Sequence, residues 1–212
     1  MGNYFEGATV DDLYEALAHA ETGTHPIAKD DPWNRTFAEG SGSSAYGPVQ
    51  LTGGEGSMID YQLKNLGKQG IIDWSNEEID YMKRFRDQAS GFLKYGGGDW
   101  KKMIKSEDNP DGTLTEEEAK AFSEKYEYGK SGTLTSDKDK AMYKQVSKRL
   151  MKQVLENAGG IGNMREFKRL WRGDTEDKVY FQKFDKKLRG IIDERSTSSM
   201  FPDDKIMESV IA

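Results

Sequence analysis

Apolar side chains recur every three or four residues through the segment TVDDLYEALAHAETG, residues 9–23. The positions that share one face are Val10, Leu13, Tyr14 and Leu17. This spacing predicts an amphipathic helix, with a capping box from Thr9 to Asp12 at its start and Gly23 at its end. The next position on the apolar stripe is Glu21, four residues after Leu17. A carboxylate therefore ends the buried face, either turned into water or partly desolvated, with a raised pKa that would let it hold a proton near neutrality.

The same helical spacing returns in six further segments, and none shows the strict alternation of a strand. These predicted helices span about 55–67, 75–95, 115–126, 135–157, 163–172 and 176–193. Between the first two helices, residues 24–54 carry three of the five prolines and little periodicity. A loop of this length in a compact domain is usually functional or disordered. The pattern predicts a mainly α fold with one long loop.

Composition narrows the possible classes of protein. The chain has 212 residues, of which 32% are charged, 35% hydrophobic and 11% aromatic, so we expect one domain with a modest core and long solvated helices. It has no cysteine, which excludes disulfides, thiolate zinc sites and cysteine nucleophiles. The net charge is −6 and the basic residues alternate with acidic ones, which disfavours binding to nucleic acid.

No targeting or membrane signal is evident in the sequence. No apolar run approaches the roughly 18 residues of a membrane span. The N-terminal segment MGNYFEG lacks the basic and apolar regions of a signal peptide, and Glu6 stands where a myristoylation signal needs Ser or Thr. We therefore expect a soluble chain without an address of its own.

The segment GSSAYGPVQLT, residues 42–52, forms part of the long loop. Its Gly47-Pro48 step cannot lie inside a helix, because proline lacks an amide hydrogen and restricts the residue before it. Ser44 and Gln50 can hydrogen-bond a polar ligand, and Gly47 lets a ligand approach the backbone. By itself, such a cluster of small residues usually marks only a connection.

Glu21 followed by SSAYGPVQLT resembles the first two motifs of lytic transglycosylases and goose-type lysozymes. In that family a catalytic Glu at a helix end precedes a small-residue segment and a Gly-x-x-Gln-apolar step, which Gly47, Gln50 and Leu51 match here. The segment ENAGGIGNMREFKRLWRGDTEDKVYFQKFDKKL is similar to the family's Asn-x-Gly turn and to its closing helix, matched by Glu176 and Tyr180. The likeness is nearest to transglycosylase domains of phage internal virion proteins.

The resemblance implies a mainly α, lysozyme-like helical domain over residues 1–195, with a long active-site loop, a helical insertion at about 96–135 and a C-terminal tail at 196–212. It implies a phage-encoded peptidoglycan lytic transglycosylase without a cofactor, whose partners are glycan strands and phage virion proteins. Such an enzyme would act from the virion, or from the host cytoplasm after release to the periplasm or cell wall.

Glycosidic cleavage needs an acid that protonates the leaving oxygen, and the resemblance assigns this role to Glu21. The same carboxylate would then take the proton of the C6 hydroxyl of N-acetylmuramic acid as a 1,6-anhydro ring closes, so no second nucleophile is required. The resemblance further implies that Ser44 orients Glu21 or the sugar, that Gly47 leaves room for the glycan and that Gln50 binds it. The full set of implied substrate-binding positions is Ser44, Tyr46, Gly47, Gln50, Asn157 and Tyr180.

Two departures from the family keep alternatives open. Glu156 stands where the family often has a tyrosine, for which Tyr180 or Tyr143 would have to compensate. The long spacing from Glu21 to Gly47 also brings in Asp30, Asp31 and Glu39. A water positioned by one of these would make the enzyme a hydrolytic lysozyme. A third alternative is an inactive virion or calcium-binding module on the same fold.

The segment EDNPDGTLTEEE, residues 107–118, is similar to an EF-hand calcium loop. The candidate ligands are Asn109, Asp111 and Glu118. The first position is Glu107 where Asp is expected, and Pro110 stiffens the turn. Because TEEE is itself a capping box, we favour a metal-free turn in which Thr115 caps the next helix.

Overall fold

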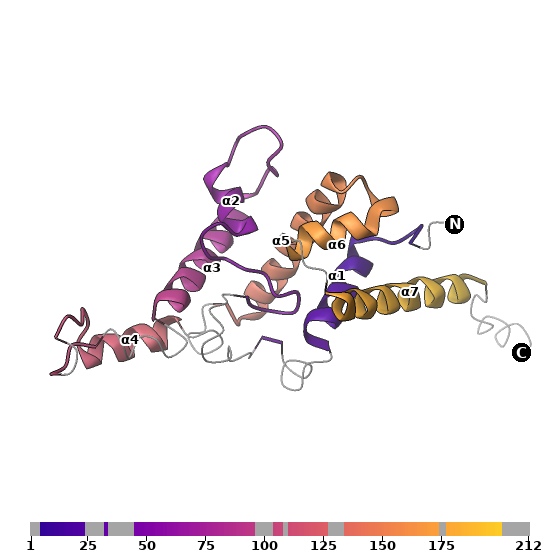
Figure 1. The fold of residues 1–212 in the computed structure, drawn as a ribbon. Coiled ribbons are helices and arrows are strands. Elements are labelled where there is room, and N and C mark those ends of the chain that lie inside the picture. The colour runs from indigo at the N-terminus through magenta and orange to yellow at the C-terminus, as the bar shows by residue number, and fades with distance from the viewer. Residues whose placement is uncertain are drawn as a thin grey trace, which may run out of the picture.

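A computed structural model describes residues 5–23, 32–33, 45–95, 104–107, 110–126, 134–173 and 177–200. Its α-helices are α1 (Val10–Ala18), α2 (Met58–Lys64), α3 (Asn76–Tyr95), α4 (Glu116–Tyr126), α5 (Asp137–Asn157), α6 (Met164–Arg172) and α7 (Lys178–Met200) (Figure 1). A π-helical turn, η1 (His19–Gly23), continues α1, and a 3-10 turn, η3 (Ile161–Asn163), precedes α6. Within the described ranges, extended pairing is limited to two isolated bridges. The prediction of a mainly α fold is confirmed.

Local hydrogen bonds fix the starts of the helices where the sequence predicts them. The Thr9 amide donates to Asp12 Oδ2 (2.7 Å), and the Thr9 hydroxyl accepts from the Asp12 amide, which completes the capping box of α1. The hydroxyls of Ser57 and Ser136 cap α2 and α5 in the same way. Each cap satisfies amide groups that have no partner inside the helix.

The ends of two helices differ from the prediction. The first helix changes from α to π geometry at His19 before it ends at Gly23. The last helix continues to Met200, into the segment assigned to the C-terminal tail. There, the hydroxyls of Ser196 and Thr197 donate to carbonyls four residues earlier (2.9 and 2.8 Å), so this polar stretch can remain helical.

Helix α1 forms the centre of the core, between α5 and α7. Leu13, Ala16 and Leu17 are fully buried. Lys148 of α5 pairs with Asp11 at the start of α1, and Lys144 lies over the ring of Tyr14 at 5.6 Å, one turn further along α1. The two helices therefore run in opposite directions, and η1 lies toward the N-terminal end of α5.

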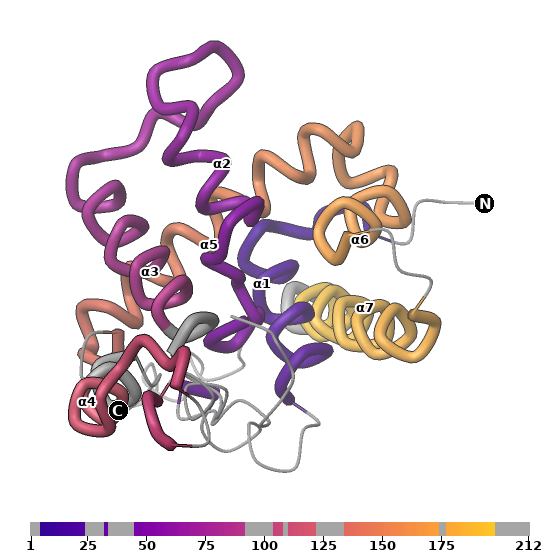
Figure 2. The backbone as a smooth tube through the Cα atoms, turned by 60° about the vertical axis from the view of Figure 1, so that its left-hand side comes forward, coloured from indigo at the N-terminus to yellow at the C-terminus, as the bar shows by residue number. Residues whose placement is uncertain are grey.

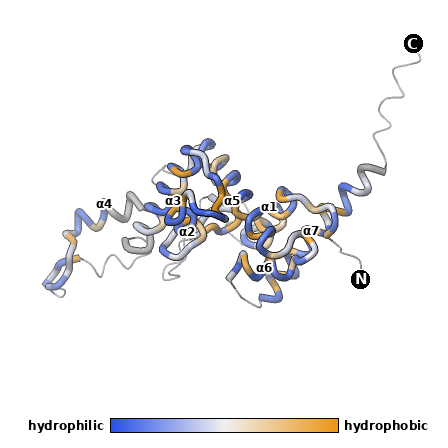
Figure 3. The backbone as a smooth tube through the Cα atoms, turned by 90° about the horizontal axis from the view of Figure 1, so that it is seen from above, coloured by the Kyte–Doolittle hydropathy of each residue, from blue (hydrophilic) through white to orange (hydrophobic). Residues whose placement is uncertain are grey.

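The remaining helices lie on two sides of α1. Helices α6 and α7 lie on one side, and α3 lies on the other, where it contacts α2 and α4 (Figure 2). Seen from above, α4 is at the outer end of this arrangement and projects away from α1 (Figure 3). Among the described helices, none is both long and apolar enough to cross a bilayer.

Candidate active site

Glu21 lies in the π-helical turn η1, where only 13% of its side chain is exposed. A π turn holds one more residue than an α turn and is frequent at functional sites. Helix α7 packs against this turn. The carboxylate at the end of the α1 stripe therefore points into the protein and is largely removed from water.

Arg172 is the main described partner of Glu21. Its Nη1 donates to both carboxylate oxygens, at 3.0 and 3.2 Å, and its Nη2 donates to Asp177 Oδ2 at 3.2 Å. Arg172 is the last residue of α6, which ends at Gly173 with a φ of 77°. Asp177 caps α7, because its Oδ1 accepts from the Tyr180 amide (3.0 Å). One guanidinium thus joins η1, α6 and the start of α7.

Tyr180 closes the cluster from the α7 side. Its side chain is buried, and the Arg172 guanidinium lies 4.2 Å from the centre of its ring. Burial raises the pKa of the Tyr180 hydroxyl far above its usual value, and the nearby Glu21 carboxylate raises it further. The phenol therefore stays protonated over the physiological range and can act only as a neutral donor or acceptor.

The charges in the cluster favour an ionised Glu21. Desolvation disfavours a carboxylate, but a guanidinium in contact with both of its oxygens stabilises it. The sequence-based hypothesis expects a desolvated acid that holds its proton. The structure supplies the desolvation and adds a cation in contact with both carboxylate oxygens, an interaction that stabilises the ionised form.

The Gly-x-x-Gln step is a tight turn that lies next to η1. The Tyr46 and Leu51 backbones form an antiparallel bridge, and the Tyr143 hydroxyl donates to the Tyr46 carbonyl (2.7 Å) and accepts from the Leu51 amide (3.2 Å). The Thr22 hydroxyl donates to the Pro48 carbonyl at 3.2 Å. Because Thr22 follows Glu21 in the chain, this turn lies against the π turn that carries Glu21.

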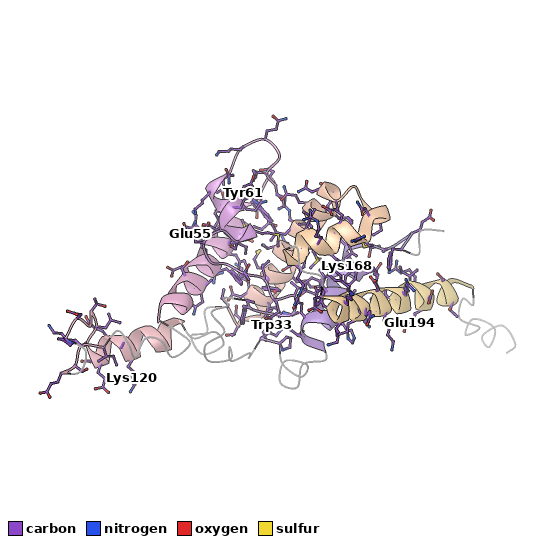
Figure 4. All side chains as sticks on the ribbon, viewed as in Figure 1. Trp33, Glu55, Tyr61, Lys120, Lys168 and Glu194 are labelled. Carbon is purple, nitrogen blue, oxygen red and sulfur yellow. The ribbon has the colours of Figure 1, made fainter. Side chains whose placement is uncertain are left out.

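Within this turn, the residues expected to bind substrate take part in packing. Gly47 has a φ of 72°, and a Cβ there would lie 2.6 Å from Cζ of Tyr143, so the space beside Gly47 is filled by a protein ring. Tyr46 is fully buried and presents no surface to a ligand. The Gln50 side-chain amide donates to the Gly47 carbonyl (2.8 Å), on its own turn. Trp33, labelled in Figure 4, comes from the long loop. Its ring packs on Tyr143, with ring centres 5.0 Å apart.

Asn157 is not brought to Glu21. It is exposed at the C-terminal end of α5, fourteen residues after Tyr143, which contacts the Gly47 turn. Fourteen residues of α-helix span about 21 Å, and α1 runs antiparallel to α5. The expectation that the Asn-x-Gly turn borders the Glu21 site is therefore corrected. The remaining expected positions, Ser44, Glu176, Asp30, Asp31 and Glu39, lie outside the described residues.

The suspected calcium loop is a turn that leads into α4. The Glu118 carboxylate accepts from the amide (2.9 Å) and the hydroxyl (3.0 Å) of Thr115, so the predicted capping box is confirmed. A Cβ on Gly112 would lie 2.4 Å from the Lys105 amide nitrogen, because the backbones pair there. Asp111 is exposed, and Asn109 lies outside the described residues. Over the described ranges, no three His, Cys, Asp or Glu residues gather as a metal site.

Sequence reasoning missed Arg172 and Asp177. A basic residue in the last turn of a helix and an Asp before the next helix are both common for local reasons, the helix dipole and capping. Nothing in that local pattern indicates that the two side chains meet Glu21.

Comparison of the chain with protein-family models, with curated proteins and with solved structures finds no match.

Proposed function

We propose that the chain is a phage-encoded peptidoglycan lytic transglycosylase, which cleaves the β-1,4 bond between N-acetylmuramic acid and N-acetylglucosamine and leaves a 1,6-anhydro product. The observation that carries the proposal is that two other segments with a motif match, the Gly47–Leu51 turn and the start of the closing helix, lie at the turn that holds Glu21, whereas the Asn157 turn does not. Glu21 ends the first helix, the Gly47–Leu51 turn lies beside it through Thr22, and Tyr180 comes from the closing helix. Short motifs that match by chance have no reason to meet in space.

The proposed reaction uses one carboxyl group twice. The Glu21 carboxylic acid gives its proton to the glycosidic oxygen as the C1–O bond breaks, and the sugar develops oxocarbenium character. The C6 hydroxyl oxygen of the same N-acetylmuramic acid then bonds to C1, and its proton passes to the Glu21 carboxylate. The acid is regenerated without a water molecule or a covalent sugar–enzyme intermediate.

Arg172 fits the second half of this reaction and opposes the first. Its contact with both oxygens stabilises the carboxylate that accepts the C6 hydroxyl proton. For Glu21 to act as an acid, that contact must give way when substrate is bound. Arg172 has a second partner to hold it, because Nη2 also donates to Asp177.

Asp177 is the second carboxylate of the described cluster, and its contacts hold the protein together. A hydrolytic lysozyme uses a second carboxylate as nucleophile or to activate water. Asp177 shares Arg172 with Glu21, but its Oδ1 accepts from the Tyr180 amide and its Oδ2 accepts from Arg172. Both of its oxygens are therefore engaged in holding the start of α7.

Digestion of purified peptidoglycan followed by mass spectrometry tests the proposal. Products ending in 1,6-anhydro-N-acetylmuramic acid are expected, and Glu21→Gln should lower turnover by a factor of at least about 100 while the fold is kept. Glu15→Gln is the matched control, because Glu15 lies on the neighbouring helix, where 57% of its side chain is exposed. Free reducing ends would favour the hydrolytic lysozyme, and no product from the wild type would favour the inactive module.

A further inference from the structure

A groove separate from the Glu21 cluster lies between α2 and the C-terminal half of α5. Its volume is about 350 Å³. Its lining includes Gly56, Tyr61, Gln62, Gly70, Gln153 and Asn157. None of these lining residues is charged, although 32% of the chain is charged. A groove with this lining suits a neutral ligand, because it offers no counter-charge to an ionic one.

Two glutamines in the groove are held in fixed orientations by a chain of hydrogen bonds. Trp74 Nε1 donates to Gln62 Oε1 (2.9 Å), Gln62 Nε2 donates to Gln153 Oε1 (2.7 Å), and Gln153 Nε2 donates to the Gly70 carbonyl (2.7 Å). Gln62 is 3% exposed. Each side-chain amide nitrogen carries two hydrogens, and this chain uses one of each. One N–H of each amide lies outside this chain of hydrogen bonds, on side chains that line the groove.

An exposed aromatic ring lies beside these amides. Tyr61 on α2 is 58% exposed, although a large ring normally gains by burial (Figure 4). The side chain of Asn157 is exposed on the α5 side of the same groove. The flat ring of Tyr61 can pack on the apolar face of a sugar ring. The neighbouring amides can hydrogen-bond the hydroxyl and acetamido groups around the edge of that sugar.

We propose that the α2–α5 groove is a second binding site for a neutral, N-acetylated glycan segment, with Tyr61 as the stacking platform and the amides of Gln62, Gln153 and Asn157 as its polar partners. The choice of an N-acetylated glycan rests on the proposed function. Asn157 lies at the opposite end of α5 from the Gly47 turn, about 21 Å of helix away from Tyr143. A strand of several sugars could be held here while another part lies at Glu21.

The test uses full-length Glu21→Gln protein, which cannot consume its ligand under the proposed mechanism, titrated with the β-1,4-linked tetramer of N-acetylglucosamine. We expect amide NMR shifts at Gly56, Gly70 and the Trp74 indole. Calorimetry should show Tyr61→Ala weakening binding by about tenfold, since stacking and buried area are both lost. Val179→Ala is the control, because Val179 is 61% exposed on α7 and does not line the groove.

Amide shifts confined to residues around Glu21, or unchanged affinity in Tyr61→Ala, would overturn the proposal. So would the absence of any shift at the groove up to about 10 mM ligand, because that concentration is tenfold above a millimolar Kd and would nearly saturate the site. Equal affinity for the glucose tetramer, which lacks acetamido groups, would overturn the N-acetylated assignment. Binding at the groove by a chain whose wild type yields no peptidoglycan product would instead overturn the proposed function and leave the second site standing.

Discussion

Replacing Arg172 with methionine would remove the cation that holds Glu21 and keep a side chain of similar length. The variant loses two contacts to Glu21, at 3.0 and 3.2 Å, and one to Asp177 at 3.2 Å. Hydrogen bonds to charged groups contribute about 1.5–3 kcal/mol each, and stranding a buried charge costs about 3–5 kcal/mol. The Arg172 side chain is 31% exposed and that of Glu21 13%, so solvent screens part of this interaction.

We therefore expect Arg172→Met to lower the free energy of unfolding by about 2 kcal/mol, which for a chain of this length lowers Tm by about 4–8 °C. Arg169→Met is the matched control on the same helix, where Arg169 pairs with Glu166 at the surface and should leave Tm unchanged. A double-mutant cycle with Glu21→Gln isolates the coupling between the two residues.

The same variant separates an electrostatic role for Arg172 from a purely structural one. Without the guanidinium, Glu21 should bind its proton more tightly and remain an acid to higher pH. On the alkaline side of the profile, the pH at which cleavage falls to half should therefore move upward in Arg172→Met. A coupling free energy below about 0.5 kcal/mol, within the error of additivity, together with an unchanged pH profile, would refute the reasoning. In that case the contact would only hold α6 against η1.

Three further predictions concern packing, pH and metal. Chemical denaturation should show that Gly47→Ala costs about 2–4 kcal/mol of stability, because its Cβ would meet Tyr143 at 2.6 Å. The control Gly56→Ala has a similar φ of 78° but open space around it, so it should cost about 1 kcal/mol. Burial alone would raise the pKa of Glu78, but its hydrogen bonds, chiefly from Arg149, outweigh this and lower the pKa below 4.5. The ionised form therefore stabilises the fold above that pH. Urea titrations should show that the stability lost in Glu78→Gln is greatest near neutral pH and shrinks as pH falls below 4.5. Calcium followed by chelator should leave Tm unchanged, because Glu118 caps α4; a large upward shift abolished by Glu118→Gln would contradict this.

The sequence by itself determined the helices and their caps. The capping boxes at Thr9 and Thr115 each join residues three positions apart, so a short stretch of sequence contains both partners. The apolar stripe of α1 likewise depends on a local spacing that matches the helical repeat. Glu21 could be singled out for the same reason, as the residue that ends that stripe.

Other features depended on contacts between distant segments. The sequence explained Gly47 by room for a ligand, whereas the structure fills that space with Tyr143, 96 residues later. The motif placed Asn157 beside Glu21, but the antiparallel packing of α1 and α5 carries it to the far end of α5. The sequence pattern specifies which face of a helix is buried, and it does not specify the direction in which two such faces pack.

The tertiary structure alone decided the charge environment of Glu21. Arg172 is 151 residues from Glu21 along the chain, and the contact between them depends on how α6 lies against η1 and on the π turn that reorients the carboxylate. The sequence analysis predicted neither feature, since a basic residue at a helix end is common for local reasons. The periodicity of the chain singled out Glu21 as the carboxylate at the end of the buried face, and the packing of the helices decided that it is largely buried and supplied its cation.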